Sequence, residues 1–352
     1  MSRFRASSVS VILVSYYSTH DLRYCLPALF DTIPLAIRVV LIDNATGDIG
    51  LDWIAEAFPR VELIRSPHNG GYGFANNIAA RLTDSDYLVF LNPDTIPRSM
   101  WLERLVEVLD AQPDVGMATP KILLLSESGK INTCGNTIHM TGISLCRGVR
   151  APESAFDQAD CVSAVSGACF AMRRSLFTEL GGFDETFFMY MEDTDLSLRA
   201  RLLGQQIAYV PESIIKHDYV LKFNKSKIFL QERNRYLMLL KSFKWQTLFL
   251  LLPALLIAEI VTWGFVFLRE RQGIAQKLMA YGWVARHWSE VLKKRNLTQQ
   301  RRLVQDRQLL AAVVWHLDIR QLGDTLLGRA AETVFDALFA PYYWCLCRLV
   351  RW

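Results

Sequence analysis

The sequence predicts an α/β domain, with a mixed and mostly parallel sheet flanked by helices, followed by a helical region. Short β-branched runs alternate with helical patterns up to about residue 217. Hydrophobic residues make up 51% and charged residues 21%, a composition that excludes a disordered protein. Residues 1–240 hold 23 Lys and Arg against 27 Asp and Glu, a net charge of −4, whereas residues 241–352 hold 16 against 8, a net charge of +8. We therefore expect two regions, 1–240 and 241–352, that meet different surroundings.

Short apolar runs are expected to form the strands, and stretches of helical periodicity the helices. Strands are predicted at 9–14, 39–42, 61–65 and 87–91, and helices at 21–30, 72–82 and 100–111. Beyond residue 115, strands are predicted at 118–125, 161–173 and 206–211, and a helix at 195–203 with Asp195 at its N-cap and Gly204 at its C-cap. Ligands of such sheets bind at the carboxyl ends of the strands, so polar residues that follow these runs are the first candidates for a site.

The region after residue 240 is predicted to associate with a membrane. Residues 247–268 form its most hydrophobic segment, which is long enough to cross a bilayer. Pro253 and Glu259 are costly inside a bilayer, so a spanning helix and a re-entrant or partly embedded helix both stay open. Basic helices are expected at 275–310, and an amphipathic helix with aromatic and arginine residues at 333–352. The alternative is that these helices pack on one another as a soluble bundle.

Cysteine usage and the N-terminus predict a cytoplasmic location. The seven cysteines have no metal-ligand or redox spacing, which favours free thiols in a reducing cytoplasm. The first eight residues are polar, and the apolar run after them is too short for a signal peptide. The basic charge of the second region is interleaved with long apolar runs, which argues against nucleic acid as a partner and for the surface of a cytoplasmic leaflet. The sequence leaves the oligomeric state unknown.

Acidic residues follow two of the predicted strands. Asp43 follows 39–42, and its carboxylate can accept a hydrogen bond from the imide N–H of uracil or thymine; the alternative is a turn or N-cap residue. Asp94 follows 87–91, and a carboxylate there can hold a hard divalent ion that neutralises a diphosphate leaving group. Asn92 would add a weaker oxygen ligand or contact a ribose.

The segment 69–77 is rich in glycine and opens a predicted helix. Glycine backbone approaches a phosphate closely, and a helix N-terminus favours negative charge. The segment lacks both the lysine of a phosphate-binding loop and the dinucleotide fingerprint, so by itself it is a weak signal.

Three carboxylates, Glu192, Asp193 and Asp195, lie within four residues. Either Glu192 or Asp193 is suited to deprotonate a sugar hydroxyl while the other binds the acceptor, and which of them is the base stays open. His217 follows the strand predicted at 206–211 and is a candidate metal ligand, although a lone histidine is more often a surface or packing residue.

Taken in order, these motifs resemble the family 2 glycosyltransferases of the GT-A fold, and most closely their bacterial rhamnosyltransferase-like branch. The resemblance covers roughly residues 8–217 and rests on the segments 9–16, 39–44, 69–77, 91–94 and 181–184 continuing into 192–196. Five motifs in the expected order and spacing make the resemblance specific.

The resemblance implies an inverting, metal-dependent glycosyltransferase of cell-surface polysaccharide synthesis, with 1–240 as its catalytic domain. It implies that Asp43 reads the donor base, that Asp94 binds Mn²⁺ or Mg²⁺ with the donor diphosphate, that Asp193 is the base, and that His217 is a further metal ligand. The donor is expected to be a dTDP- or UDP-sugar, with rhamnose as the sugar that the resemblance suggests, and to contact the following residues: Ser15, Tyr16, Asp43, Asn69, Gly70, Asn76 and Asn92. The implied acceptor is a lipid-linked saccharide at the cytoplasmic side of the bacterial inner membrane, where the enzyme is peripheral or anchored by one segment.

Two positions depart from the family pattern, since Asn92 stands where many members carry the first Asp of Asp-x-Asp, and Tyr17 where the first strand usually carries Asn. A catalytically degenerate membrane scaffold is one alternative function. A processive polysaccharide synthase is another, but Gln231 is followed by Glu-Arg-Asn-Arg-Tyr and not by the Gln-x-x-Arg-Trp pattern. A sugar-nucleotide pyrophosphorylase would need a basic, glycine-rich loop after the first strand, where residues 15–18 read Ser-Tyr-Tyr-Ser.

Overall fold

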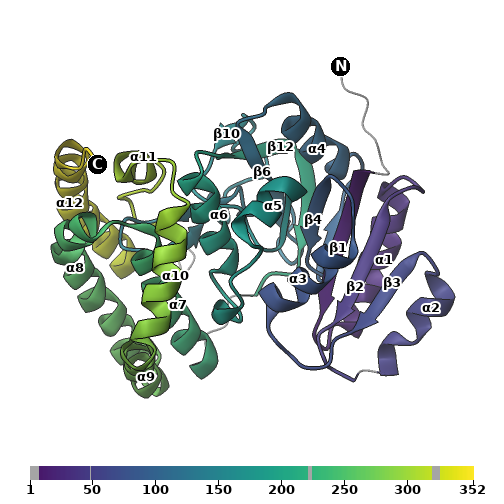
Figure 1. The fold of residues 1–352 in the computed structure, drawn as a ribbon, viewed down its shortest axis with the longest axis horizontal. Helices are drawn as coiled ribbons and strands as arrows, with labels where there is room; N and C mark the ends of the chain where they lie inside the picture. Colours follow the sequence, from purple (N-terminus) through teal and green to yellow (C-terminus); the bar gives the residue numbers. More distant parts are fainter. Residues whose placement is uncertain (1–7, 48, 221–223, 319–325) are drawn as a thin grey trace. The chain divides into compact units, whose positions relative to one another are not determined.

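The computed structural model describes residues 8–47, 49–220, 224–318 and 326–352. The chain divides into two compact units. The first comprises residues 1–136, 146–200 and 205–219, and the second comprises 137–145, 201–204 and 220–352. The ribbon of Figure 1 labels helices and strands from both units.

A mixed sheet of ten strands forms the centre of the first unit. Its main order is β10-β12-β6-β11-β4-β1-β2-β3, while β5 pairs with β12 and β7 pairs with β6. The pairs β1–β2, β1–β4, β2–β3 and β6–β12 are parallel, and β11 lies antiparallel between β4 and β6. The strands are β1 (Val9–Ser15), β2 (Arg38–Asp43), β3 (Val61–Arg65), β4 (Tyr87–Leu91), β5 (Thr95–Pro97), β6 (Val115–Leu124), β7 (Ile131–Thr133), β10 (Asp160–Cys161), β11 (Cys169–Arg173) and β12 (Gln206–His217). A separate two-stranded sheet joins β8 (Asn136–Ile138) to β9 (Ser144–Cys146).

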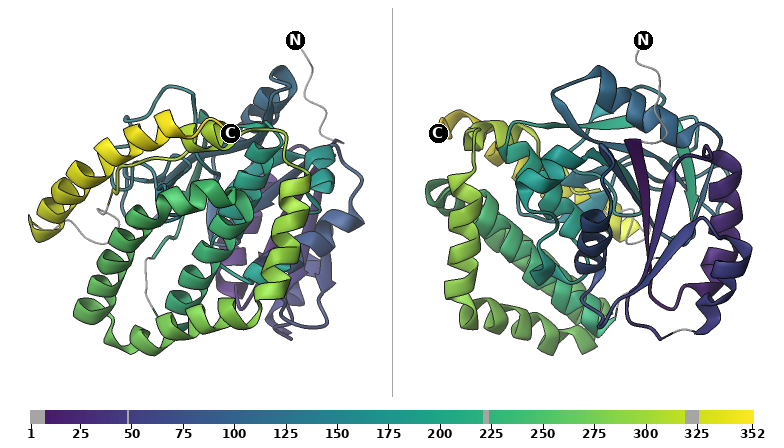
Figure 2. Two further views of the ribbon diagram at one scale, coloured as in Figure 1. Left: turned by 60° about the vertical axis from the view of Figure 1, so that its left-hand side comes forward. Right: turned by 45° about the vertical axis from the view of Figure 1, so that its right-hand side comes forward.

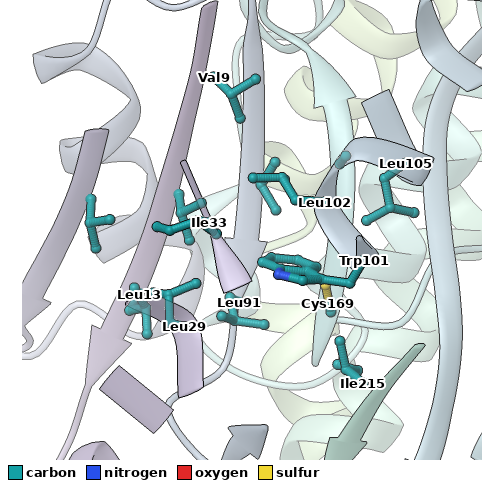
Figure 3. Packing of buried hydrophobic residues seen from close by; sticks show 14 of the residues in the cluster. Val9, Leu13, Leu29, Ile33, Leu91, Trp101, Leu102, Leu105, Cys169 and Ile215 are labelled. Carbon is teal, nitrogen blue, oxygen red and sulfur yellow. The ribbon is translucent and has the colours of Figure 1, made fainter. Parts of the chain in front are cut away.

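Helices cover both faces of the large sheet, which explains why every residue of β1 is buried. The main apolar cluster joins one face of the sheet to α1 (Thr19–Thr32), α2 (Trp53–Ala57) and α4 (Trp101–Ala111). Within it, the fully buried Trp101 lies beside Leu91, Cys169 and Ile215 (Figure 3). The helices α3 (Tyr72–Leu82), α5 (Arg174–Leu180) and α6 (Glu192–Leu202) complete this part of the chain, together with the short turns η2 (Ile49–Leu51) and η3 (Glu185–Phe187).

The second unit is helical. Its elements are α7 (Lys225–Ser242), α8 (Trp245–Arg269), the turn η4 (Arg271–Gly273), α9 (Ile274–Arg286), α10 (Trp288–Gln300), α11 (Asp306–Ala311) and α12 (Leu326–Leu349). The helix α7 packs against α9 and α10, and Figure 2 shows these helices in green. Side chains of α10 close the end of α7: Arg295 donates to the carbonyl of Phe243 at 2.6 Å, and Gln299 donates to that of Lys241 at 2.7 Å. Arg295 is therefore a buried helix cap and not part of a basic surface.

The structure confirms the predicted fold class, and the strands at 61–65 and 87–91 and the helix at 72–82 have the predicted bounds. Two local predictions are wrong. The run 161–173 is two strands, because the chain turns between them and the Cys169 N–H donates to the Ser166 carbonyl. Asp195 is not an N-cap: α6 begins at Glu192, and Asp195 lies inside it, fully buried, with Arg199 Nε 2.7 Å away.

Candidate functional site

The carboxyl ends of β1, β2 and β3 bring Ser15, Asp43 and Arg65 into register. The Asp43 carboxylate is buried, and both of its oxygens are engaged. Arg65 Nη1 donates to Oδ2 at 2.9 Å, and the backbone N–H of Thr46 donates to Oδ1 at 2.9 Å. The Ser15 hydroxyl is buried without a hydrogen-bond partner among the residues that the structure describes. Asp43 is therefore held firmly at the strand edge, beside a hydroxyl that can still bind a ligand.

An exposed aromatic pair follows β1. Tyr16 is 47% exposed and Tyr17 is 67% exposed, and their rings meet edge to face with centroids 4.9 Å apart. Tyr17 has a positive φ of 55°, which turns the chain sharply out of the strand. The ring of Tyr16 is thus available for a planar ligand at the edge that holds Asp43.

The glycine-rich segment is fixed against the loop that precedes α6. Gly71 has a φ of +88°, and a Cβ there would lie 2.0 Å from the carbonyl oxygen of Phe188. The Tyr72 N–H donates to that same oxygen at 2.8 Å. The Asn69 side-chain oxygen accepts from Asn44 at 2.9 Å and from the Gly71 N–H at 3.0 Å. Only glycine fits position 71, because any side chain would separate the two loops.

Two asparagines of α3 use their amides within the protein. Asn76 is buried and donates to the carbonyl one turn earlier at 2.9 Å. Asn77 donates to the Phe183 carbonyl at 3.0 Å and accepts from its N–H at 2.9 Å. At Gly70 a Cβ would collide with the side chain of Phe74. Asn76 and Gly70 therefore have packing roles in this structure, and their contact with a donor stays a prediction.

Asp193 is anchored by two backbone N–H groups at the start of α6. Gly167 donates to Oδ2 at 2.7 Å, and Thr194 donates to Oδ1 at 2.7 Å. The Thr194 hydroxyl adds a third hydrogen bond to Oδ1 at 3.1 Å. These donors stabilise the charged carboxylate, although burial acts against them and raises the pKa of Asp193.

Glu192, beside it, is buried, and its Oε2 has no hydrogen-bond partner in the described part of the chain. Burial, and then the charge of Asp193, raise the pKa of Glu192 to about 8. The two carboxyl groups therefore differ at neutral pH, where Glu192 is mostly protonated and Asp193 has the donors that favour the ionised form.

We expect Glu192→Gln to remove a pH-dependent loss of stability. Between the unfolded pKa, near 4.5, and about 8, the folded chain binds the proton that the unfolded chain has released. Wild-type stability should therefore fall as pH rises through this window, by at most about 1.4 kcal/mol per pH unit from this group. The variant lacks that slope. The urea concentration at its unfolding midpoint, relative to that of the wild type, should therefore rise from pH 5 to pH 9. Parallel curves for the two proteins would contradict the protonated state of Glu192.

Strained backbone precedes this carboxyl pair. Phe188, Tyr190 and Met191 have φ values of 61°, 67° and 66°, which non-glycine residues rarely adopt. The Tyr72 hydroxyl donates to the Gly167 carbonyl at 2.9 Å, so the glycine-rich segment also contacts the residue that anchors Asp193. Such strain persists only where neighbouring contacts impose it, and it is concentrated at functional sites.

Asp94 and His217 form a second centre. The Asp94 Oδ1 and His217 Nε2 atoms lie 3.3 Å apart, and that oxygen is buried without a hydrogen-bond partner among the described residues. His217 Nδ1 lies 2.9 Å from Asn132 Oδ1, and in the neutral tautomer with the proton on Nδ1 this contact leaves the lone pair of Nε2 facing Asp94. Two ligand atoms that each lie about 2.1 Å from an octahedral ion are about 3 Å apart. The pair therefore fits a divalent cation, with Asn132 orienting the imidazole.

Further carboxylates lie near this centre. Burial, and then the charges of Asp94 and Asp218, raise the pKa of Asp21 in the first turn of α1, with His20 acting in the opposite direction. Asp218 also binds the backbone carbonyl of Asp94 at 2.9 Å through its N–H. A cation bound at Asp94 would offset the repulsion that Asp21 experiences from these carboxylates, which supports the same assignment for Asp94.

A short backbone path connects the two centres. The Asn92 N–H donates to the Ala168 carbonyl at 2.9 Å, and the preceding residue, Gly167, donates to Asp193. Asn92 lies two residues before Asp94. The structure therefore brings the predicted base and the predicted metal ligands to one sheet edge, although they are far apart in the sequence.

Sequence reasoning missed the residues that position these groups. Asn132 lies on the short strand β7, and Gly167 lies in a run that looked like continuous strand. Asp21 is predicted only as a helix residue, and Tyr72 only as part of the glycine-rich segment and the helix that it opens. Arg65 carried a usable signal, because it ends β3 beside the end of β2, where an opposite charge pairs with Asp43.

Residues 10–181 match the model of glycosyl transferase family 2. The pre-mycofactocin glycosyltransferase of Mycobacterium tuberculosis is 30% identical over 184 residues, which are 52% of this chain and 38% of that protein. The N-acetylglucosaminyl-diphospho-decaprenol L-rhamnosyltransferase of the same species is 27% identical over 231 residues, 59% of this chain and 75% of that protein. The chain therefore spans well under half of the first relative and three quarters of the second.

The chain also shares its fold with a solved structure. The structure of S. aureus TarS 1-349 in complex with UDP-GlcNAc covers 97% of this chain and 90% of its own, with a TM-score of 0.55 and 15% sequence identity. Identity at that level shows the shared fold alone. The fold, the motif order and the family match agree, and residues 10–181, just under half of the chain, form a glycosyl transferase family 2 domain.

Proposed function

We propose that this protein is an inverting glycosyltransferase that moves a sugar from a nucleoside diphosphate donor to a lipid-linked saccharide. One observation carries the proposal: the Asp193 carboxylate, held by two N–H groups, is linked to Asp94 by one backbone path, Asp193–Gly167–Ala168–Asn92–Asp94. Single displacement needs both, because the acceptor hydroxyl must lose a proton while the diphosphate gains charge.

Asp193 is the base in this proposal. Its carboxylate is held by hydrogen bonds that favour the ionised form, whereas Glu192 is mostly protonated at neutral pH. A protonated Glu192 can donate a hydrogen bond to the acceptor instead. The proton of the acceptor hydroxyl passes to Asp193 as the hydroxyl oxygen attacks the anomeric carbon and the diphosphate leaves.

Asp94 and His217 would hold Mn²⁺ or Mg²⁺, which would neutralise the diphosphate charge. Two protein ligands leave coordination positions for phosphate oxygens and water, as is usual for magnesium bound with a nucleotide. Ser15, Tyr16 and Asp43 offer a hydroxyl, a ring and a carboxylate to the nucleoside at the adjoining strand ends. Asn69, Gly70, Asn76 and Asn92 complete the donor contacts that we propose.

The donor and acceptor follow from the relatives. The decaprenol rhamnosyltransferase takes its name from a rhamnosyl transfer to a lipid diphosphate saccharide. We therefore propose a dTDP-rhamnose donor first and a UDP-sugar second, and a polyprenyl-diphosphate saccharide as acceptor. The second unit would place the enzyme at the cytoplasmic leaflet, since α8 is long and apolar enough to meet a bilayer.

A donor screen tests the proposal. Purified protein with Mn²⁺ or Mg²⁺ is incubated with dTDP-, UDP- and GDP-sugars, with and without a detergent extract of bacterial lipid-linked saccharides. Metal-dependent release of a nucleoside diphosphate that requires the extract is the expected result. If the folded protein releases no nucleoside diphosphate from any donor, the result would favour the catalytically degenerate scaffold.

Asp94→Asn should lower turnover at least about 100-fold. The loss of one charged ligand weakens the binding of the metal and, with it, the neutralisation of the diphosphate charge. Asn132→Ala keeps both ligands but frees the imidazole, so it should raise the half-saturating Mn²⁺ concentration about 10- to 100-fold. Asp84→Asn is the matched control, because that side chain is 99% exposed. Equal metal dependence in Asp94→Asn and Asp84→Asn would overturn the metal assignment.

A further inference from the structure

The helix α8 presents a continuous apolar stripe to the outside of the second unit. We define the α8 stripe as Phe249, Leu252, Leu256, Ile260 and Phe267, which are between 47% and 73% exposed. They recur at intervals of three, four and seven residues, so they lie on one side of the helix. Five large apolar side chains in one line make a patch of the kind that marks an interaction surface.

The opposite side of α8 is buried. Leu248, Leu251, Ala254 and Ala258 pack inside the second unit. By length and composition the helix could cross a membrane, with a mean hydropathy of 2.1 over its most apolar window. Its two sides nevertheless differ in surroundings, which a helix lying in an interface requires and a lipid-surrounded span does not.

Glu259, in the middle of α8, binds a buried ionic cluster with α7 and α9. Its Oε2 lies 3.1 Å from Lys277 Nζ and accepts from the Tyr281 hydroxyl at 2.5 Å, while its Oε1 pairs with Arg235. Lys277 Nζ also lies 2.8 Å from Glu232 Oε1. Four charges thus surround the helix midpoint.

An α8 that crossed the bilayer would carry this cluster to the hydrocarbon centre. The helix α7 would have to follow, and its buried residues include Arg233, Arg235 and Lys241. Charged side chains are disfavoured most at that depth. With α8 parallel to the membrane, only the α8 stripe enters the apolar layer, and the ionic cluster stays inside the protein, outside the hydrocarbon.

Basic residues stand at the end of the stripe. Arg269 closes α8, and Arg271 follows it, both exposed. Trp245, 48% exposed, opens the helix, in the position that interfacial tryptophan favours. The region from residue 241 onward has a net charge of +8. This charge is complementary to anionic lipid headgroups, which a second copy of the same basic surface would not offer.

We propose that α8 lies in the plane of the membrane, with the α8 stripe inserted in an anionic lipid surface and without crossing it. This deepens the membrane association that forms part of the proposed function. The enzyme is then monotopic, and the depth of its second unit is set by one face of one helix.

Vesicle flotation of the full chain tests the surface. We compare vesicles of phosphatidylglycerol and phosphatidylethanolamine with vesicles of phosphatidylcholine alone. The wild type should float with the anionic vesicles, and the Phe249→Ser, Ile260→Ser double variant should bind them at least about tenfold more weakly. Leu303→Ser is the matched control, since Leu303 is 76% exposed but lies outside α8. Equal binding by the double variant and the wild type would overturn the inference, as would a monomer–dimer change without a change in vesicle binding.

Depth measurements test the orientation. Nitroxide labels are placed at Phe249→Cys, Leu256→Cys and Phe267→Cys, in a background with serine at the accessible cysteines Cys146, Cys161, Cys345 and Cys347. The outer two labels are about 27 Å apart along the helix. An in-plane helix gives all three labels a similar, shallow depth. A deep central label between two shallow outer labels would mean that α8 crosses the bilayer, and that result would overturn the proposal.

The two proposals fail separately. Sugar transfer in detergent needs no bilayer, and vesicle binding needs no donor. Lost flotation with turnover retained in the double variant supports the in-plane stripe. Absence of turnover in the wild type overturns the proposed function and leaves the vesicle result standing.

Discussion

Asp193→Asn is expected to lower kcat about 10²- to 10⁴-fold, the range over which a positioned general base contributes to catalysis. An amide of nearly the same shape keeps the side chain in place but cannot take the acceptor proton. Because the pKa of Asp193 is raised, the acid limb of the wild-type kcat/KM profile should lie above the ordinary range of an aspartate, and the variant should lose that limb. Initial rates across pH with the donor found in the screen measure both effects.

Two comparisons separate the chemistry from packing. Gly167→Ala keeps the N–H that binds Asp193 but places a Cβ 3.3 Å from the Asp193 Oδ2 atom. It should therefore displace the carboxylate slightly and lower kcat less than Asp193→Asn does. Asp31→Asn removes an exposed carboxylate from α1 and should leave the rate unchanged. A rate for Asp193→Asn within a few-fold of that of Asp31→Asn would assign the base elsewhere, and Glu192→Gln would be the next variant to measure.

Elements of the first unit could be predicted from the sequence where one local pattern determines one element. The run 87–91 is apolar and lies between polar turns, so its bounds follow from its composition. The run 161–173 is similar in composition but is broken, because the turn at Ser166–Gly167 serves Asp193, which lies 26 residues away from Gly167. A local pattern cannot report a partner at that distance, and the break is where we propose that the catalytic base is anchored.

The helix α7 shows the same limit in another form. Its buried positions include Glu232, Arg233 and Arg235, so it has no apolar stripe that a periodicity search would detect. Glu232 and Arg235 are buried because their partners, Lys277 and Glu259, come from α9 and α8. The guanidinium of Arg233 lies over the ring of Trp283 of α9. The sequence did contain one trace of this arrangement: an acidic residue in the middle of an apolar segment indicates a buried cation nearby.

Only part of the proposed metal site could be predicted from the sequence. Asp94 follows a recognisable strand, and His217 stood out as a candidate ligand, here as the last residue of β12. Their approach to 3.3 Å depends on the pairing of β5 with β12, which places Thr95 opposite His217. Asn132 gave no signal, since it acts only through the imidazole, 85 residues further along the chain.

Replacing Glu259 by leucine should destabilise the second unit by about 3–5 kcal/mol, although it makes α8 more hydrophobic. Arg235 and Lys277 have side chains only 3% and 1% exposed, and both pair with Glu259. Removing the carboxylate leaves buried positive charge in excess, with Glu232 alone to balance it. Hydrogen exchange of the amides of α7 to α9, measured by mass spectrometry in the full chain, gives the local free energy of opening. Ile260→Leu, at the exposed neighbouring position, is the control and should change exchange little.

A double variant shows whether unpaired charge is the cause. Glu259→Leu with Arg235→Met removes one charge of each sign and leaves Glu232 paired with Lys277 at 2.8 Å. If the cost of Glu259→Leu comes from uncompensated charge, the double variant should recover a large part of the lost protection. Additive losses would mean that Glu259 acts through shape or through its tyrosine hydrogen bonds. In that case the ionic cluster would not be what holds α8 against α7 and α9, and the strongest reason for its in-plane orientation would disappear with it.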